Sequence, residues 1–132
     1  MDDIRILVAE DDPVFRRVIV FTLKQLGFVV DAVSDGHQAI ELLQQGRYDL
    51  LVTDHQMPQC SGLELIERLR DLQAYAQLPV ILCTARGLEL DKRTLLERYQ
   101  LADIMHKPFS PRLLADKVRH QVQRCEASCA TH

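Results

Sequence analysis

The stretch Tyr48–Pro58, with the sequence YDLLVTDHQMP, decides how the rest of the chain is organised. Its apolar part, Leu50–Thr53, is rich in strand-forming residues and leads directly into the carboxylate of Asp54. A buried strand cannot continue through Pro58, because proline has no backbone N–H to donate to a neighbouring strand. We therefore expect a buried strand that presents Asp54 at its carboxyl end, where open α/β sheets gather ligands and chemistry. On this stretch alone, a turn-capping role for Asp54 is favoured.

The composition indicates one ordinary globular domain. The chain has 132 residues, of which 47% are hydrophobic and 27% charged, so it can bury a real core. Its net charge of −3 gives no overall basic field for nucleic acid or an anionic membrane. No apolar run approaches the roughly 18 residues that span a bilayer, and the acidic N-terminus is unlike a secretory signal. We therefore expect a cytoplasmic protein.

The cysteines are expected to be reduced thiols, because nothing in the sequence indicates export to an oxidising compartment. They are Cys60, Cys83, Cys125 and Cys129. Cys125 and Cys129 are spaced i, i+4 and lie near His132, which is compatible with a weak metal site. Free thiols are favoured over that alternative, and we assign these cysteines no function.

Five apolar runs alternate with five amphipathic segments along the chain. Strands are expected at residues 4–9, 28–33, 50–54, 78–83 and 101–106. Helices are expected at residues 13–26, 35–45, 61–74, 90–99 and 111–124. The apolar stripe of the first helix consists of Val14, Phe15, Val18, Ile19, Thr22, Leu23 and Leu26. We expect one domain over residues 1–124, followed by a fraying C-terminal tail over residues 125–132.

This alternation predicts a doubly wound parallel sheet, since right-handed crossovers place helices on both faces. Five strands suit the flavodoxin-like (βα)5 order 2-1-3-4-5, in which the strand order reverses between strands one and three. That order brings Glu10 and Asp11, which follow the first strand, beside Asp54. Thr84 and Lys107, at the ends of the fourth and fifth strands, are expected to flank them.

These side chains together suit phosphoryl chemistry. Three carboxylates at one sheet edge repel one another unless protons or a cation intervene, and hard oxygen ligands favour Mg²⁺ over zinc or copper. A carboxylate such as Asp54 can attack phosphorus, while a lysine and a hydroxyl contact the phosphoryl oxygens. Each residue alone has an ordinary alternative: Glu10–Asp12 as an acidic helix start, Thr84 as a strand end and Lys107 as a surface lysine. Their conjunction at neighbouring strand ends favours the site.

Four segments carry a resemblance to a known family: ILVAEDDP, DLLVTDHQMPQCSGLEL, PVILCTAR and ADIMHKPFSP. Their order and spacing resemble the receiver domain of two-component response regulators, of the single-domain chemotaxis-protein type, from about Ile4 to about Arg124. The resemblance implies that a histidine kinase or phosphotransfer protein phosphorylates Asp54. It implies a Mg²⁺ cofactor held by Glu10, Asp11, Asp54 and the backbone carbonyl of Gln56.

The same resemblance implies a switch rather than an enzyme, although the receiver would promote its own phosphorylation and dephosphorylation. Thr84 would be the switch hydroxyl, Lys107 would pair with the phosphoryl group, and the Lys107–Pro108 peptide would be cis. Phosphorylation would change a surface made by the fourth helix, fifth strand and fifth helix, which a downstream protein effector would bind. A phosphorylation-dependent dimer is left open, and direct binding of nucleic acid or membrane is not expected.

The sequence departs from the family pattern at the position three residues before Lys107. Ile104 stands there in place of the usual aromatic switch residue, so the familiar coupling between threonine and aromatic ring is in doubt. Gln56 and Arg86 lie two positions beyond Asp54 and Thr84, beside the path of an attacking water, and should alter the lifetime of the phosphoryl group. His55 and His106 are expected to be structural or surface residues.

Three other functions compete with the phosphoryl switch. A pseudo-receiver that is never phosphorylated could act as a docking or dimerisation module, but the complete acidic set argues against it. A flavodoxin-like electron carrier needs a phosphate-binding loop where this chain has Glu10–Asp12, which would repel a flavin phosphate. A haloacid-dehalogenase-type phosphatase needs a second aspartate where this chain has Gln56.

Overall fold

The computed structural model of the chain describes residues 3–85 and 92–130. Within them the strands are β1 (Arg5–Ala9), β2 (Val29–Val33), β3 (Leu50–Asp54), β4 (Val80–Thr84) and β5 (Asp103–His106). The helices are α1 (Pro13–Gln25), α2 (Gly36–Gln45), α3 (Gly62–Arg70), α4 (Lys92–Arg98) and α5 (Pro111–Ala130), with a short 3-10 turn η1 (Gln73–Tyr75). Strands therefore form at the aliphatic runs and helices at the amphipathic segments between them.

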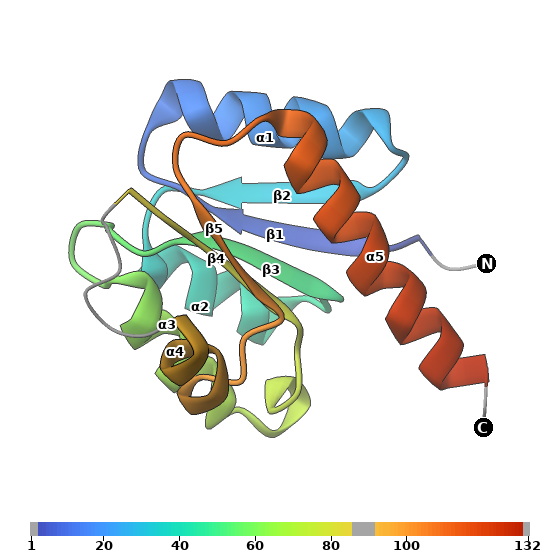
Figure 1. Cartoon of the computed structure of the whole chain (residues 1–132). Coiled ribbons are helices and arrows are strands. Elements are labelled where there is room, and N and C mark those ends of the chain that lie inside the picture. Colours follow the sequence, from blue (N-terminus) through green and yellow to red (C-terminus); the bar gives the residue numbers. More distant parts are fainter. Residues whose placement is uncertain (1–2, 86–91, 131–132) are drawn as a thin grey trace.

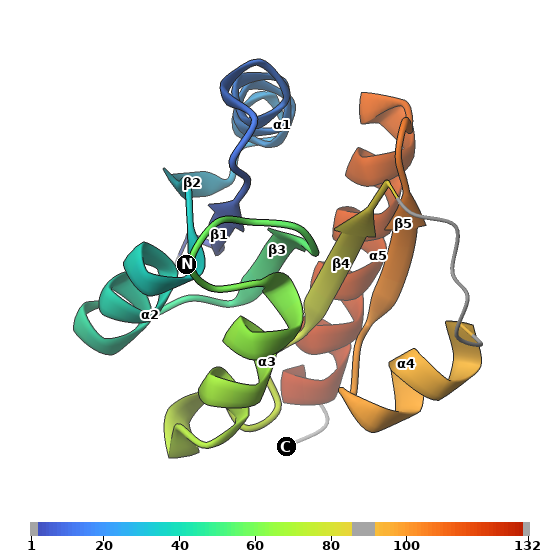
Figure 2. The ribbon, with the colours of Figure 1, turned by 90° about the vertical axis from the view of Figure 1, so that its left-hand side faces the viewer.

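The strands form one parallel sheet in the order β2-β1-β3-β4-β5, which confirms the predicted fold. The register pairs Ala9 with Thr53, Asp54 with Cys83 and Thr84 with His106, so β1, β3, β4 and β5 end close together. Figure 2 views the sheet from this carboxyl edge. Residues that leave these strands therefore meet at one edge of the sheet.

Helices cover both faces of the sheet, with α1 and α5 on one face and α2, α3 and α4 on the other (Figure 1). Alternate residues of β1 divide between two cores, because successive side chains of a strand point to opposite faces. Ile6 and Val8 pack with α1 and α5, whereas Leu7 and Ala9 pack with the other three helices. Both faces of the central strands are buried, which explains their continuous apolar sequences.

Short polar side chains begin the helices, as expected for N-caps. The carboxylate of Asp12 accepts hydrogen bonds from the backbone of Val14 and Phe15, and Pro13 occupies the first helical position of α1. Asp35 caps α2 and Ser61 caps α3 in the same way. These caps fix where each helix leaves the carboxyl edge of the sheet, and hence where Glu10 and Asp54 lie.

The predicted apolar stripe of α1 is wrong at its outer positions. Val14 and Val18 are 71% and 40% exposed, whereas Ile19 and Leu23 are buried. The helix contacts β1, β2 and α5. Val18 lies at the margin of the contact with α5, where it lines a small cavity with Phe109 and Leu114. Periodicity alone cannot show how wide the contact is.

Several predicted boundaries also differ. β4 and β5 begin at Val80 and Asp103 rather than at residues 78 and 101, because Leu78 and Leu101 are buried in the core by loops that precede the strands. α3 ends at Arg70 and is followed by η1, where one longer helix was expected. α5 continues to Ala130, beyond the predicted helix end at 124. The division into residues 1–124 and 125–132 stays a prediction.

The first residues of the predicted fourth helix, 90 and 91, lie outside the described residues, and α4 begins at Lys92. Among residues 3–85 and 92–130, none of the helices combines the length and apolar character that a membrane span requires.

Candidate functional site

Three carboxylates meet at the carboxyl edge of β1 and β3. Glu10 follows β1 directly, and its backbone N–H donates to the carbonyl of Val33, which extends the β1–β2 pairing by one residue. Asp54 ends β3, the next strand of the sheet. One carboxylate oxygen from each of Glu10, Asp11 and Asp54 lies within 4.8 Å of the others. Glu10 and Asp54 are buried, whereas Asp11 is exposed, so the cluster opens to solvent on one side.

Lys107 is the cation that faces this cluster. Its Nζ lies 2.5 Å from Oε1 of Glu10 and 3.3 Å from Oδ1 of Asp54, and its side chain is only 17% exposed. Within the described part of the chain these are the ion pairs of the cluster. One ammonium therefore balances three carboxylates, and a negative charge remains to be neutralised by a proton or a cation.

The pKa values of the two buried acids are raised chiefly by burial, and the neighbouring carboxylates add to the rise. Burial raises the pKa of Glu10 to about 7, and the charge of Asp54 adds to the rise, although hydrogen bonds from Lys107 and from the backbone of Asp12 oppose it. Burial likewise raises the pKa of Asp54, Lys107 opposes the rise, and Asp11 adds to it. Burial alone would lower the pKa of Lys107, but its hydrogen bond to Glu10 and the nearby carboxylates raise it. The lysine stays charged while the acids compete for protons.

Thr84 and Lys107 come from neighbouring strand ends at the same edge. Thr84 is fully buried at the end of β4, opposite His106 of β5. Its carbonyl accepts the backbone N–H of Lys107 at 2.7 Å. The structure thus brings Glu10, Asp11, Asp54 and Lys107 into one cluster and holds Thr84 on the strand between Asp54 and Lys107.

Gln56 lies beside the cluster. It is exposed and, together with Asp11 and residues of the loop after β3, lines a shallow hollow of about 520 Å³. His55 lines the same hollow and is half-buried, and its Nδ1 has no hydrogen-bond partner among the described residues. His106 is exposed, with its Nδ1 2.9 Å from the carbonyl oxygen of Lys107. Neither histidine belongs to the carboxylate cluster.

Other predicted features can be placed as well. The Lys107–Pro108 peptide is cis, as the resemblance implied. Ile104 is buried in the core on the α4 side of the sheet. Arg86 lies outside the described residues.

The described cysteines agree with the expectation of free thiols. Cys60 and Cys83 are buried and unpaired, and burial raises the pKa of Cys83 to about 12. The side chains of Cys125 and Cys129, and His132, lie outside the part of the chain that the structure describes.

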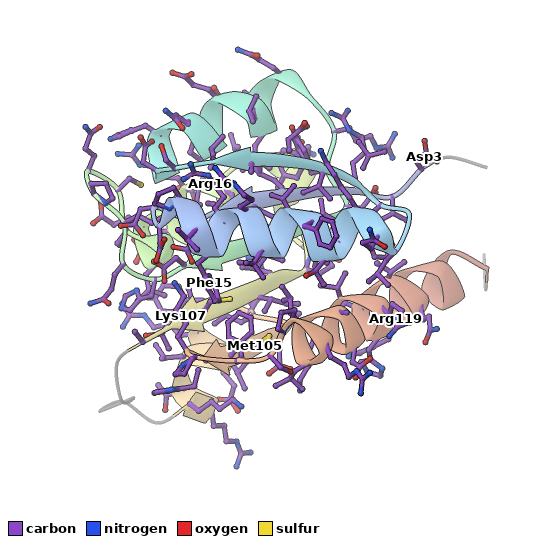
Figure 3. The ribbon with its side chains drawn as sticks, turned by 90° about the horizontal axis from the view of Figure 1, so that it is seen from above. Asp3, Phe15, Arg16, Met105, Lys107 and Arg119 are labelled. Atoms are coloured by element: carbon purple, nitrogen blue, oxygen red, sulfur yellow. The ribbon has the colours of Figure 1, made fainter. Side chains whose placement is uncertain are left out.

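Sequence reasoning missed two supporting residues on α1, Phe15 and Arg16, and left the role of Asp12 open. Asp12 is an N-cap and not a member of the cluster, so the helix-start interpretation holds for this acid. Arg16 donates from Nη1 to the carbonyl oxygen of Glu10 at 2.8 Å and so fixes the loop after β1. Phe15 lies under the ammonium of Lys107 (Figure 3). No spacing rule links these residues to Lys107 or Glu10. The only sequence signal is that they lie in the first residues of α1, directly after the acidic loop.

We expect the metal-free protein to lose stability as the pH rises from about 5 to about 8. The pKa of Glu10 is about 7 in the folded state against 4.5 for a free side chain. The folded state therefore binds this proton more tightly, and the stabilisation, complete below the unfolded pKa, disappears as the pH passes the folded one. The expected loss is on the order of 2 kcal/mol. Urea unfolding in a chelating buffer at both pH values measures it.

Glu10→Gln should remove most of this pH dependence, whereas Glu41→Gln, on the exposed side of α2, should leave it unchanged. A metal-free protein that gains stability over the same interval would contradict the charge imbalance at the cluster.

Comparisons with known proteins agree on one kind of domain. The family model described as the response regulator receiver domain matches residues 6–119. The phosphate regulon transcriptional regulatory protein PhoB of Escherichia coli strain K12 is 34% identical over 120 residues, covering 91% of this chain and 52% of PhoB. The chain thus spans about half the length of curated relatives such as PhoB.

Solved structures give the same result. The receiver domain of sensor histidine kinase PA1611 from Pseudomonas aeruginosa, described with a magnesium ion coordinated in its active site cleft, is 29% identical with a TM-score of 0.82, covering 92% of this chain and 99% of that one. A CheY-like receiver domain protein from Methanospirillum hungatei has a TM-score of 0.87 at 20% identity, covering 96% and 99%. The second likeness concerns the fold alone.

Proposed function

This chain belongs to the response regulator receiver domain family of two-component systems, and we propose that it works as a phosphorylation switch with Asp54 as the phosphoryl acceptor. Such a domain is a signalling switch and not a conventional enzyme. The observation that carries the proposal is the cluster itself, in which Lys107 lies 3.3 Å from the carboxylate of Asp54 beside two further acids. The proposal also includes the donor of the phosphoryl group, which would be a histidine kinase or a phosphotransfer protein.

The proposed chemistry takes place on the Asp54 side chain at this edge. An Oδ atom of Asp54 attacks the phosphorus of a phosphohistidine on the donor, the P–N bond breaks, and the imidazole leaves with its electron pair. The product is an acyl phosphate on Asp54. Water later attacks the same phosphorus, which releases inorganic phosphate and restores the carboxylate. The receiver promotes both steps chiefly by positioning and by balancing charge.

A magnesium ion fits the acidic cluster. Glu10, Asp11, Asp54 and the backbone carbonyl of Gln56 would hold it, since Mg²⁺ prefers hard oxygen ligands at an open, partly hydrated site. The raised pKa values of Glu10 and Asp54 support this, because burial disfavours the charged form of both carboxylates and neighbouring acids add to the effect, so a bound cation would stabilise them. The ion would neutralise negative charge on the phosphoryl oxygens.

Lys107 and Thr84 would respond to the phosphoryl group. The ammonium of Lys107 would exchange its contact with the Asp54 carboxylate for one with a phosphoryl oxygen, and the Thr84 hydroxyl would contact another. The added charge of roughly two units would shift the surface made by α4, β5 and α5 between two states. Because Ile104 stands where the family usually has an aromatic ring, the coupling between Thr84 and this surface would need a substitute for that ring.

The partners and setting follow from the same proposal. A downstream protein effector would bind the switched surface, in the cytoplasm and without direct contact with nucleic acid or membrane, and phosphorylation could promote a dimer. Residues 1–124 would form the receiver domain and residues 125–132 a C-terminal tail. Gln56 and Arg86 would influence how long the phosphoryl group lasts.

The proposal is tested with the wild-type protein, acetyl phosphate and Mg²⁺. Intact mass spectrometry should detect one added phosphoryl group, and none when Mg²⁺ is chelated. Beryllofluoride with Mg²⁺ should shift the backbone amide resonances of Thr84 and Lys107. If neither reagent acts and Mg²⁺ does not bind, the phosphorylation switch is wrong, and the chain is a pseudo-receiver that serves as a docking or dimerisation module.

A further inference from the structure

The ammonium of Lys107 rests on the face of an aromatic ring as well as facing two acids. Its Nζ lies 4.6 Å from the centroid of the Phe15 ring (Figure 3). Phe15 belongs to the first turn of α1, whereas Lys107 follows β5. The ring therefore reaches across from another element to the cation of the carboxylate cluster.

Phe15 is held in place both through its ring and through its backbone. Phe109 packs against it edge to face, with the ring centroids 5.2 Å apart and the planes at 80°. The backbone N–H of Phe15 donates to the carboxylate of Asp12, the N-cap of α1. Because Asp12 also donates from its backbone to Oε2 of Glu10, the ring and the acidic loop are parts of one local arrangement.

A ring face attracts a cation, most strongly where water is excluded. The Lys107 side chain is 17% exposed, and its ammonium lies closer to Glu10, at 2.5 Å, than to Asp54, at 3.3 Å. With acids alone, the flexible lysine chain could settle on Glu10 and leave Asp54. The fixed ring adds a third contact, so the ammonium remains at a position from which it reaches both carboxylates.

We propose that Phe15 is a positioning residue for Lys107, holding the ammonium over its ring so that it faces the phosphoryl group on Asp54. This inference rests on the proposed function and adds to it a residue of α1 that is neither a proposed metal ligand nor a proposed partner of the phosphoryl group. It predicts that the ring matters for binding a phosphoryl mimic only through Lys107.

The test compares matched variants of the whole chain. Phe15→Leu removes the ring, Phe15→Tyr keeps it, and Phe21→Leu makes the same change on α1 at a side chain that is 63% exposed. Beryllofluoride affinity at saturating Mg²⁺, measured by titration calorimetry, should weaken about three- to tenfold in Phe15→Leu. It should be nearly unchanged in Phe15→Tyr and Phe21→Leu.

Two further measurements separate positioning from packing. The ε-methylene protons of Lys107 should show a ring-current shift in the wild-type protein that disappears in Phe15→Leu but not in Phe21→Leu. In a Lys107→Met background, Phe15→Leu should cause no further loss of beryllofluoride affinity. An equal loss in both backgrounds, or an unchanged lysine resonance in Phe15→Leu, would overturn the inference.

The outcome can be distinguished from failure of the proposed function. If the wild-type protein binds neither beryllofluoride nor Mg²⁺ and takes up no phosphoryl group, the phosphorylation switch is wrong. The Lys107 resonance then tests only the contact between Lys107 and Phe15. A ring-current shift that disappears in Phe15→Leu supports this contact, and a shift that remains in Phe15→Leu overturns it.

Discussion

The Asp54→Asn protein is expected to take up no phosphoryl group from acetyl phosphate in the presence of Mg²⁺, under conditions in which the wild-type protein takes up one. The carboxamide cannot replace the carboxylate oxygen that attacks phosphorus, so the rate should fall by at least about a hundredfold. It also removes one charge from the acidic cluster and should weaken Mg²⁺ binding. Intact mass spectrometry of freshly reacted protein measures both the amount and the rate of labelling.

Loss of labelling through unfolding can be excluded in the same experiment. Burial and the neighbouring Asp11 raise the pKa of Asp54, so a neutral amide there should leave the metal-free protein at least as stable near neutral pH. The matched control is Asp35→Asn, which changes the N-cap of α2 to another good capping residue. This control should be labelled like the wild type. Equal labelling of the Asp54→Asn protein would mean that another residue accepts the phosphoryl group.

The sequence was sufficient for the fold and for the acidic part of the site. Apolar runs such as Leu50–Val52 appear where a strand is covered on both faces, and their alternation with amphipathic helices leaves few ways to arrange the sheet. Because parallel strands end at one edge, the strand order alone predicted that Glu10 and Asp54 would lie together. These conclusions depend on periodicity and topology, both of which a single sequence carries.

Contacts between elements that no periodicity relates could not be predicted. The approach of Phe15 to Lys107 depends on how α1 packs against the loop before α5, which is settled by side-chain shape in three dimensions. The exposure of Val14 has the same origin, because the width of the contact between α1 and the sheet decides which apolar residues are covered. Leu78 is apolar because it is buried in the core from the loop before β4, so the sequence pattern does not distinguish it from a strand residue.

A Gly62→Ala substitution is expected to destabilise the protein by about 3 kcal/mol, because the new methyl group would collide with backbone. A Cβ at this position would lie 2.3 Å from the carbonyl oxygen of Asp54 and 3.0 Å from the Cα of His55. Neither atom belongs to a side chain that could rotate away. The hydrogen bond from the Gly62 N–H to the carbonyl oxygen of His55, at 2.9 Å, also ties the start of α3 to the end of β3.

The matched control is Gly46→Ala, where the closest atom to an added Cβ is the Leu42 carbonyl oxygen at 3.4 Å and the backbone φ of −125° is open to any residue. This control should change the free energy of unfolding by no more than about 1 kcal/mol. Urea unfolding of the two variants measures the difference. Because the obstructed carbonyl belongs to Asp54 itself, the folded Gly62→Ala protein should also accept phosphoryl groups more slowly than the Gly46→Ala protein. Equal stability of the two variants would show that the loop after β3 can move without cost, and the close approach of α3 to Asp54 would then not be what holds the acceptor in place.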